Sequence, residues 1–303
     1  MANDLKLAST SAQPEGPAPG AARSFLMGLV GRDIQGSKSP AMHEQEAAAL
    51  HLRCLYQLLD LHVLGRGVDA LPELLASAEL MGFAGLNITH PCKQAVIPLL
   101  HELSEDARAI GAVNTVQFVG GRRFGFNTDA AGFAESFRRG LPGAPLERVV
   151  QLGAGGAGAA TASAMLKLGA AHLCIVDSVQ ERAAALVDNL SRFFPAARLS
   201  AEGDPGVAVK SAQGLVHATP TGMREYPGLP ISAASLHSDL WVAEIVYFPL
   251  ETELLRTARA LGCRTLDGGG MAVFQAAAAF EIFTGQQANR ERMLEHFQRI
   301  PGE

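Results

Sequence analysis

A glycine-rich turn between a strand and a helix is the feature that most constrains the fold. The apolar strand 148–152 runs into the sequence GAGGAG at 153–158, and a helix of small residues follows. A second apolar strand, 172–176, then ends on Asp177. This order of elements predicts a βαβ unit of a parallel sheet: a strand, a glycine turn, a helix, and a second strand with an acid at its tip.

Each part of this turn has a physical reason to bind a dinucleotide. Gly153 permits the tight turn, Gly155 lets a pyrophosphate approach the backbone, and Gly158 lets the helix pack closely on the strand. The helix N-terminus, with Gly156 and Ala157, faces the phosphate charge. A plain glycine turn is the alternative in a chain with 32 glycines, but the surrounding strands, helix and acid favour a nucleotide site.

Asp177 bears on the choice of nucleotide. A carboxylate at this strand tip accepts hydrogen bonds from both ribose hydroxyls and repels a 2′-phosphate. Ser178 and Val179 follow, so no arginine stands directly beside it, and Arg182 is expected on the first turn of the next helix. We therefore predict NAD as the cofactor, with NADP less favoured.

The alternation of strands and helices extends over nearly the whole chain. Strands are expected at 25–30, 54–61, 83–88 and 112–119, and helices at 68–81, 93–103 and 129–139. Ser39 is expected to cap a helix that begins at Pro40, and Gly120-Gly121 to turn a hairpin. This alternation predicts an α/β fold of parallel sheets with helices on both faces.

The length of 303 residues suits two domains. Residues 1–23 are rich in Ala, Ser, Pro and Gly, so we predict a disordered leader there. The last two helices, 271–283 and 289–300, have no strand of their own and are expected to fold back on the first domain. We predict a substrate-binding and catalytic domain formed by residues 24–128 plus 271–303. A Rossmann-like dinucleotide-binding domain, residues 129–270, is expected to face it across a cleft.

Composition excludes several classes of partner. The net charge of −5 and the scattered basic residues predict neither nucleic acid nor an anionic membrane as partner. No apolar run suits a signal peptide or a bilayer span. The four cysteines stand far apart, so reduced thiols in a cytoplasmic protein are expected. His90 and Cys92 lack a third ligand at usable spacing, so no metal site is predicted.

Three segments of the first half carry polar residues where a buried α/β pattern disfavours them. They are GSKSP at 36–40, NITHPCK at 87–93, and AVNT at 112–115 together with NTD at 127–129. The second segment stands at the end of an apolar strand, which is where open α/β sheets bind ligands. These segments are therefore candidates for a substrate site.

The same segments resemble the motifs of the shikimate dehydrogenase family, including its quinate/shikimate members. That family has an S-x-S-P loop, an N-x-T-x-P-x-K strand end, a G-A-x-N-T strand and an N-T-D turn. In the second half, ATPTGM at 218–223, VYFP at 246–249 and GGGM at 268–271 with Gln275 match its A-T-P-x-G-M, V-Y-x-P and G-x-G-M…Q segments. The matches run in order from about residue 25 to residue 285.

The resemblance implies a hydride transfer between a ring carbinol and a nicotinamide. Lys93 matches the family's catalytic lysine and Asp129 its partner carboxylate. The reaction needs a base for the hydroxyl proton, and a lysine positioned near an aspartate is suited to act on that proton. Whether Lys93 is the free base or mainly orients the hydroxyl is left open by the sequence.

The resemblance also assigns the binding residues. Ser37 and Ser39 match the serines that bind the substrate carboxylate. Asn87, Asn114 and Gln275 match amides that hold the ring hydroxyls, since an amide can both donate and accept. Thr89 and Tyr247 match the residues that complete the pocket. Further residues of the second half join the glycine turn in the cofactor site: Thr219, Pro220, Met223, Val246, Gly268 and Met271.

Departures from the family pattern bear on the physiological role. Gly36 stands where many members have histidine, and Asp177 stands where NADP-specific members have Asn-Arg-Thr. His90 and Cys92 replace residues that are apolar in biosynthetic members. These changes favour an NAD-linked member that serves quinate or shikimate catabolism, or acts on an aminoshikimate, over the enzyme of aromatic amino acid biosynthesis through chorismate.

Three alternatives to a shikimate dehydrogenase stay open at this point. A quinate dehydrogenase shares every motif, because the two substrates share a carboxylate and three hydroxyls. A folate-type dehydrogenase is disfavoured by the loop with Ser37 and Ser39. A non-catalytic dinucleotide-binding protein is disfavoured by the intact Lys93 and Asp129. The sequence allows both a monomer and a homodimer.

Overall fold

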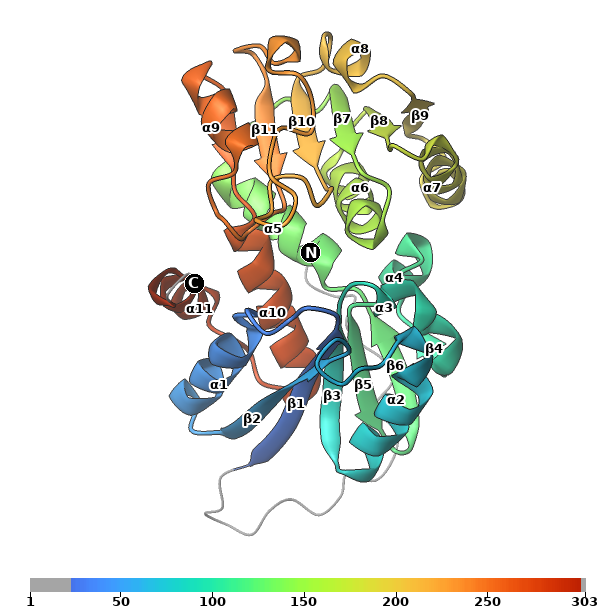
Figure 1. Cartoon of the computed structure of the whole chain (residues 1–303), viewed down its shortest axis with the longest axis vertical. Coiled ribbons are helices and arrows are strands. Elements are labelled where there is room, and N and C mark those ends of the chain that lie inside the picture. The colour runs from blue at the N-terminus through green and yellow to red at the C-terminus, as the bar shows by residue number, and fades with distance from the viewer. Residues whose placement is uncertain (1–22, 301–303) are drawn as a thin grey trace.

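The structure, a computed structural model, describes residues 23–300, so the leader predicted at 1–23 lies outside the described residues apart from Arg23. Two six-stranded sheets organise the chain, one above the other in Figure 1. Helices α5 (Asp129–Gly140) and α10 (Gly269–Thr284) lie between them. None of the helices in 23–300 has the length and apolar character needed to cross a membrane.

The first sheet is mixed, with the strand order β2-β1-β3-β5-β6-β4. Strand β5 runs antiparallel to both of its neighbours, β3 and β6. The prediction of parallel strands therefore holds for the pairs of β1 with β2 and β3 and of β4 with β6, but it is wrong for β5. The predicted hairpin between β5 and β6 is present, with Gly120 and Gly121 at φ 56° and 71°. The strands are β1 (Ser24–Gly31), β2 (Arg53–Asp60), β3 (Phe83–Ile88), β4 (Glu102–Leu103), β5 (Thr115–Val119) and β6 (Arg122–Phe126).

The helix predicted at 93–103 is wrong. Pro98 cannot donate to a helical hydrogen bond, so the segment splits into the short α3 (Cys92–Ala95), a 3-10 turn at Ile97–Leu99 and the strand β4. A helix that the sequence analysis missed follows, capped by the hydroxyl of Ser104. The other helices on this sheet are α1 (Ser39–Ala49), α2 (Leu71–Leu80), preceded by a 3-10 turn at Val68–Ala70, and the missed α4 (Glu105–Ile110).

The second sheet is parallel throughout, with the order β12-β11-β10-β7-β8-β9. The chain leaves β7 toward β8 and β9, then returns to the other side of β7 with β10. Ligands of open parallel sheets bind at this switch of direction, outside the carboxyl ends of the strands. The strands are β7 (Arg148–Leu152), β8 (His172–Val176), β9 (Arg198–Glu202), β10 (Gly214–His217), β11 (Trp241–Glu244) and β12 (Arg264–Leu266).

Helices cover both faces of the second sheet, as the alternation predicts. They are α6 (Gly156–Leu168), α7 (Gln180–Phe193), α8 (Pro205–Val209) and α9 (Glu253–Ala260), with a 3-10 turn at Ala233–Ser235. Their small and aliphatic side chains fill the cores on either side of β7 and β10. Trp241 of β11 closes one core edge-on against Phe137 of α5, with ring centroids 4.9 Å apart.

The last two helices pack on the first sheet. Phe274 and Phe280 of α10 share a core with Met27 of β1, and so does Phe297 of α11 (Arg290–Arg299). Helix α5 instead buries Phe133 in the core of the second sheet. We therefore propose the predicted division, with the segments 24–128 plus 271–303 and 129–270 as two domains that meet at α5 and α10.

Candidate active site

Lys93 and Asp129 form an ion pair at the edge of the first sheet that faces the second. Lys93 lies on α3, just after β3, and Asp129 begins α5, just after β6. The Lys93 Nζ is 2.6 Å from Asp129 Oδ2, and the two side chains are 18 % and 7 % exposed. A cation and a carboxylate so placed can exchange a proton with a ligand hydroxyl while water has little access.

Asn114 holds the aspartate in place. Its Nδ2 donates to Asp129 Oδ1 and to Thr128 Oγ1, both at 2.9 Å. Its Oδ1 accepts from the Thr128 backbone N–H at 2.8 Å and from the Thr115 hydroxyl at 3.0 Å. Both hydrogens of the amide are therefore used within the protein, so here Asn114 positions Asp129.

A tyrosine that the sequence analysis missed completes this network. Tyr56 of β2 is 4 % exposed, and its hydroxyl donates to Asn87 Oδ1 at 2.8 Å. The Asn87 Nδ2 donates onward to Thr115 Oγ1 at 3.1 Å. Burial raises the pKa of Tyr56, and a hydrogen bond with the Ser39 side chain opposes that rise. Tyr56 thus links the 37–39 loop to β3, but in the sequence it looks like any core residue of a strand.

The predicted helix cap at Ser39 is wrong. Helix α1 already includes Ser39, and the residue before it, Lys38, has a helical backbone and no capping bond. The Ser37 hydroxyl accepts from the Ser39 N–H at 3.2 Å, which is the bond a cap two residues upstream makes. The Ser39 hydroxyl is therefore not used as a cap and faces Tyr56.

Asp60 organises the loop that leads to these serines. Its carboxylate accepts from the backbone N–H groups of Asp33, Ile34 and His62 and from the side chain of Gln35, at 2.9–3.0 Å. Burial raises the pKa of Asp60, but these hydrogen bonds outweigh it and hold the pKa below the ordinary value of 3.8. The ionised carboxylate is thus part of the loop's structure.

Asp60→Asn is expected to lower the free energy of unfolding by about 2 kcal/mol at pH 7, because two of the four donors lose their acceptor and the other two keep only a neutral one. The lowered pKa means that wild type gains this stability above pH 3.8 and loses it as the pH falls through the lower folded-state pKa. Thermal melts of both proteins from pH 7 to pH 2.5 measure this. A difference in Tm that does not shrink at low pH contradicts the explanation.

Tyr247, Thr89 and Gln275 border the same region from three directions. Tyr247 follows β11, and although the residue is 41 % exposed, desolvation and the charge of Asp129 raise the pKa of its hydroxyl. Thr89 directly follows β3, with its methyl against Gly31. Gln275 lies where α10 crosses α5, and its Nε2 donates to Ala272 O of its own helix at 2.9 Å.

The glycine turn adopts the geometry that its sequence predicts. Gly153 has φ +101°, and an added Cβ would lie 2.4 Å from Ala218 O. At Gly158 an added Cβ would lie 2.2 Å from Gly153 O, whereas at Gly155 it would meet nothing within 4 Å. The turn is therefore closed toward the sheet and open toward solvent, as a phosphate-binding turn requires.

Two side chains fix this turn. The buried Gln151 of β7, which the sequence analysis missed, donates from Nε2 to the carbonyls of Gly153 and Gly158 at 2.9 and 2.8 Å. Asp177 stands at the tip of β8, where Oδ2 accepts from Ala154 N–H at 2.8 Å and Oδ1 from Val179 N–H at 2.9 Å. The carboxylate is thus tied to the turn itself, at the position where a ribose would lie.

Two alanine substitutions in the turn should have opposite effects. Gly155→Ala is expected to leave the Tm within about 2 °C, since the site is open, but to weaken NADH binding about tenfold by blocking the pyrophosphate. Gly158→Ala should destabilise the fold by about 1–3 kcal/mol, because its Cβ meets backbone. Thermal melts and NADH fluorescence titrations check both; equal losses of Tm would contradict this reading.

The glycine turn and the ion pair are neighbours in space. A Cβ added at Gly156 would lie 3.6 Å from Lys93 Cδ. A Cβ added at Gly268 would lie 2.4 Å from Ile245 O and 2.6 Å from Val246 O. The segments after β7 and β10 thus meet at Gly153, those after β11 and β12 meet at Gly268, and the turn after β7 lies beside Lys93.

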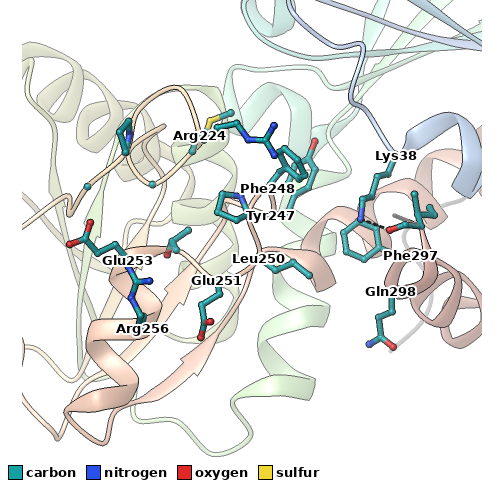
Figure 2. A pocket seen from close by; sticks show the side chains of 17 residues that line it. Lys38, Arg224, Tyr247, Phe248, Leu250, Glu251, Glu253, Arg256, Phe297 and Gln298 are labelled. Carbon is teal, nitrogen blue, oxygen red and sulfur yellow. Dashed lines mark hydrogen bonds between the residues drawn. The ribbon is translucent and has the colours of Figure 1, made fainter. Parts of the chain in front are cut away.

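An open pocket of about 690 Å³ continues from this region between the two halves of the molecule. Figure 2 shows Lys38 and Phe297 on one side and Arg224, Phe248 and Arg256 on the other. Tyr247 and Met223 line the pocket, whereas Lys93 and Asp129 do not. Within residues 23–300, no group of three His, Cys, Asp or Glu side chains is placed to hold a metal.

A glycine turn at the switch point of a parallel sheet, with a lysine–aspartate pair beside it, defines a dehydrogenase that uses a nicotinamide dinucleotide. The chain matches the shikimate dehydrogenase substrate binding domain over residues 29–116 and the shikimate 5′-dehydrogenase C-terminal domain over 268–296. Because a curated relative is 57 % identical over 92 % of this chain, the chain belongs to the shikimate dehydrogenase family.

Relatives with different cofactor names are similar over nearly their whole length. A shikimate dehydrogenase (NADP⁺) of Streptomyces avermitilis is 57 % identical over 92 % of this chain and 97 % of its own. A quinate/shikimate dehydrogenase (NAD⁺) of Corynebacterium efficiens is 47 % identical over 90 % and 98 %. The solved structure of quinate dehydrogenase from Corynebacterium glutamicum in complex with NAD superposes with a TM-score of 0.86 at 44 % identity, covering 92 % of this chain and 100 % of that one.

Proposed function

We propose that this protein transfers a hydride between shikimate and NAD, forming 3-dehydroshikimate and NADH, and the reverse. The observation that carries the proposal is the shielded Lys93–Asp129 pair beside the glycine turn. Relatives whose names carry this activity span nearly the whole chain. A non-catalytic dinucleotide-binding protein has no need of such a pair.

The proposed division of labour follows from the contacts. Lys93 takes or orients the proton of the reacting hydroxyl, and Asp129, fixed by Asn114, holds the ammonium in place. Ser37 and Ser39 bind the carboxylate, while Asn87, Thr89, Tyr247 and Gln275 surround the ring. We add Tyr56 to this set, because its hydroxyl joins Asn87 to the serine loop.

The residues of the second sheet fit a dinucleotide, and when bound it supplies the hydride acceptor. Gly155 leaves its outer face open for the pyrophosphate, and Gly156 and Ala157 begin the helix that faces it. We propose that the nicotinamide end lies along the segments that follow β10, β11 and β12, which contain Thr219, Pro220, Met223, Val246, Gly268 and Met271.

We propose a preference for NAD because Asp177 would lie against a 2′-phosphate. Two backbone N–H groups donate to its carboxylate and hold it at the end of β8. The relatives support NAD(P) in general, since the Streptomyces enzyme is named for NADP⁺ and the Corynebacterium enzymes for NAD⁺.

Quinate is the second candidate substrate, favoured by the similarity to the quinate dehydrogenase of Corynebacterium glutamicum. Initial rates with purified protein in four combinations, shikimate or quinate with NAD or NADP, separate the candidates. Dominance of shikimate with NAD is the expected result. If quinate is preferred, only the substrate assignment changes, and if NADP is preferred, the role proposed for Asp177 is wrong. If no combination gives a measurable rate, the proposed function is wrong. Cytoplasmic location and the choice between monomer and homodimer stay predictions.

A further inference from the structure

His217 and Glu244 form a buried pair beneath the cofactor segments. They end the neighbouring strands β10 and β11 and are direct register partners. The His217 Nδ1 lies 2.9 and 2.8 Å from the two Glu244 oxygens, and neither side chain is exposed. Replacing such a pair with apolar residues is often neutral or stabilising, so its presence suggests a purpose other than stability.

The glutamate end of the pair holds the segment after β11. Glu244 Oε1 accepts from the Val246 backbone N–H at 2.9 Å, and Oε2 accepts from the Thr252 hydroxyl at 3.2 Å. Because an ionised carboxylate only accepts, the His217 Nδ1 carries the hydrogen between them. The carboxylate thus fixes Val246, whose carbonyl lies against Gly268.

The histidine end holds the segment after β10. The His217 Nε2 lies 2.5 Å from Thr219 Oγ1, which also accepts from the Thr221 backbone N–H at 3.3 Å. With hydrogen on Nδ1, a neutral imidazole accepts the Thr219 hydroxyl hydrogen at Nε2. The hydroxyl is then locked, with its methyl toward the glycine turn, where it would lie 3.1 Å from a Cβ on Gly153.

One continuous chain of hydrogen bonds therefore runs from Val246 through Glu244 and His217 to Thr219. Its two ends are backbone and side-chain groups of the segments proposed to hold the nicotinamide end of the cofactor. Neither side chain is exposed, so any effect on binding must pass through the groups that the pair holds, which are Thr219, Val246 and Thr252.

We propose that the His217–Glu244 pair is a positioning device for the cofactor: it locks the Thr219 hydroxyl and sets the spacing between the segments after β10 and β11. The inference rests on the proposed function only in that a nicotinamide dinucleotide binds against these segments. His217 and Glu244 are positioning residues and take no part in the chemical step.

Two substitutions of His217 separate its two bonds. Asparagine has a donor near the place of Nδ1 and none near Nε2, so His217→Asn keeps the bond to Glu244 and releases Thr219. The amide of glutamine reaches the place of Nε2 and leaves no donor near that of Nδ1. His217→Gln therefore keeps a partner for Thr219 but leaves the Glu244 carboxylate without its main donor. A positioning role predicts that His217→Asn loses more cofactor affinity than His217→Gln, whereas His217→Gln loses more stability.

The measurement is the Kd of NADH by nicotinamide fluorescence, with Tm recorded for each protein. His217→Asn should weaken NADH binding about fivefold, the value of one hydrogen bond, with little loss of Tm. His217→Gln should lose more Tm while its Kd stays within about twofold. The matched control is Ser163→Ala on α6, which removes a buried hydroxyl that has no hydrogen-bond partner within residues 23–300. It should leave the Kd unchanged.

A double-mutant cycle keeps the proposal testable if His217→Gln fails to fold. In a Thr219→Val background the same His217→Asn change should have no further effect on the Kd, because the hydroxyl that it releases is absent. Additive effects, or a Kd that simply follows Tm across the variants, would overturn the positioning role. Because NADH binding is measured without turnover, absence of activity on shikimate and quinate would overturn the proposed function alone.

Discussion

Lys93→Met is expected to lower kcat for the oxidation of shikimate about a thousandfold while NADH binding stays within about twofold. A positioned proton acceptor contributes between 10² and 10⁴ to rate, and methionine keeps the length of the side chain without its charge. The Lys93 Nζ is 2.6 Å from Asp129, beside the turn at Gly156 rather than part of it. The chemical step should therefore fail while the cofactor still binds.

The control is Lys167→Met, which removes a lysine from an exposed pair with Asp106. Exposed pairs of this kind contribute about 0–1 kcal/mol, so kcat and Tm should both stay close to wild type. Asp129→Asn should also reduce kcat strongly, since the amide no longer attracts the ammonium. If Lys93→Met keeps more than a tenth of wild-type kcat, the assignment of this lysine is wrong.

Asp177→Asn is expected to change the ratio of kcat/KM for NAD over NADP about a hundredfold in favour of NADP. Two charges about 4 Å apart near a protein surface interact by up to about 4 kcal/mol, and removal of about two thirds of that repulsion gives this ratio. The neutral side chain can still accept one of the two N–H groups that Asp177 now binds, so the turn should keep its shape.

Asp188→Asn, on the exposed face of α7, removes the same charge farther along the chain and should leave the ratio unchanged. Arg182 lies on the first turn of α7, so Arg182→Ala in the Asp177→Asn background tests whether it pairs with the 2′-phosphate. A ratio that does not move in Asp177→Asn would mean that the carboxylate stabilises the turn without selecting the cofactor.

Local patterns predicted most of the fold. The glycine turn, the strand before it and the acid after it determine the βαβ unit through short-range geometry, and the structure contains them at the expected residues. The failures are also local: Pro98 lies within the helix that was expected over 93–103 and interrupts it, and Ser37 makes the bond that was assigned to Ser39. In both cases a local hydrogen-bonding property decided the outcome: proline has no N–H to donate, and the Ser37 hydroxyl accepts the N–H of Ser39.

The missing parts of the candidate site depend on long-range register. Tyr56 reaches Asn87 only because β1 pairs with β2 on one side and with β3 on the other, which fixes the register between these two strands. His217 meets Glu244 because β10 and β11 pair in register across 27 residues of sequence. No spacing in the sequence reveals such partners, whereas the residues matched by the resemblance could be named in advance.

The most direct test of the central claim follows the hydride itself. The protein is incubated with 3-dehydroshikimate and NADH carrying two deuterium atoms at the reactive ring carbon, and the mass of the shikimate formed is measured. We predict a gain of one deuterium on the new carbinol carbon, at a rate about a thousandfold lower with Lys93→Met. Shikimate formed without deuterium, or no shikimate with wild-type protein, would contradict the account.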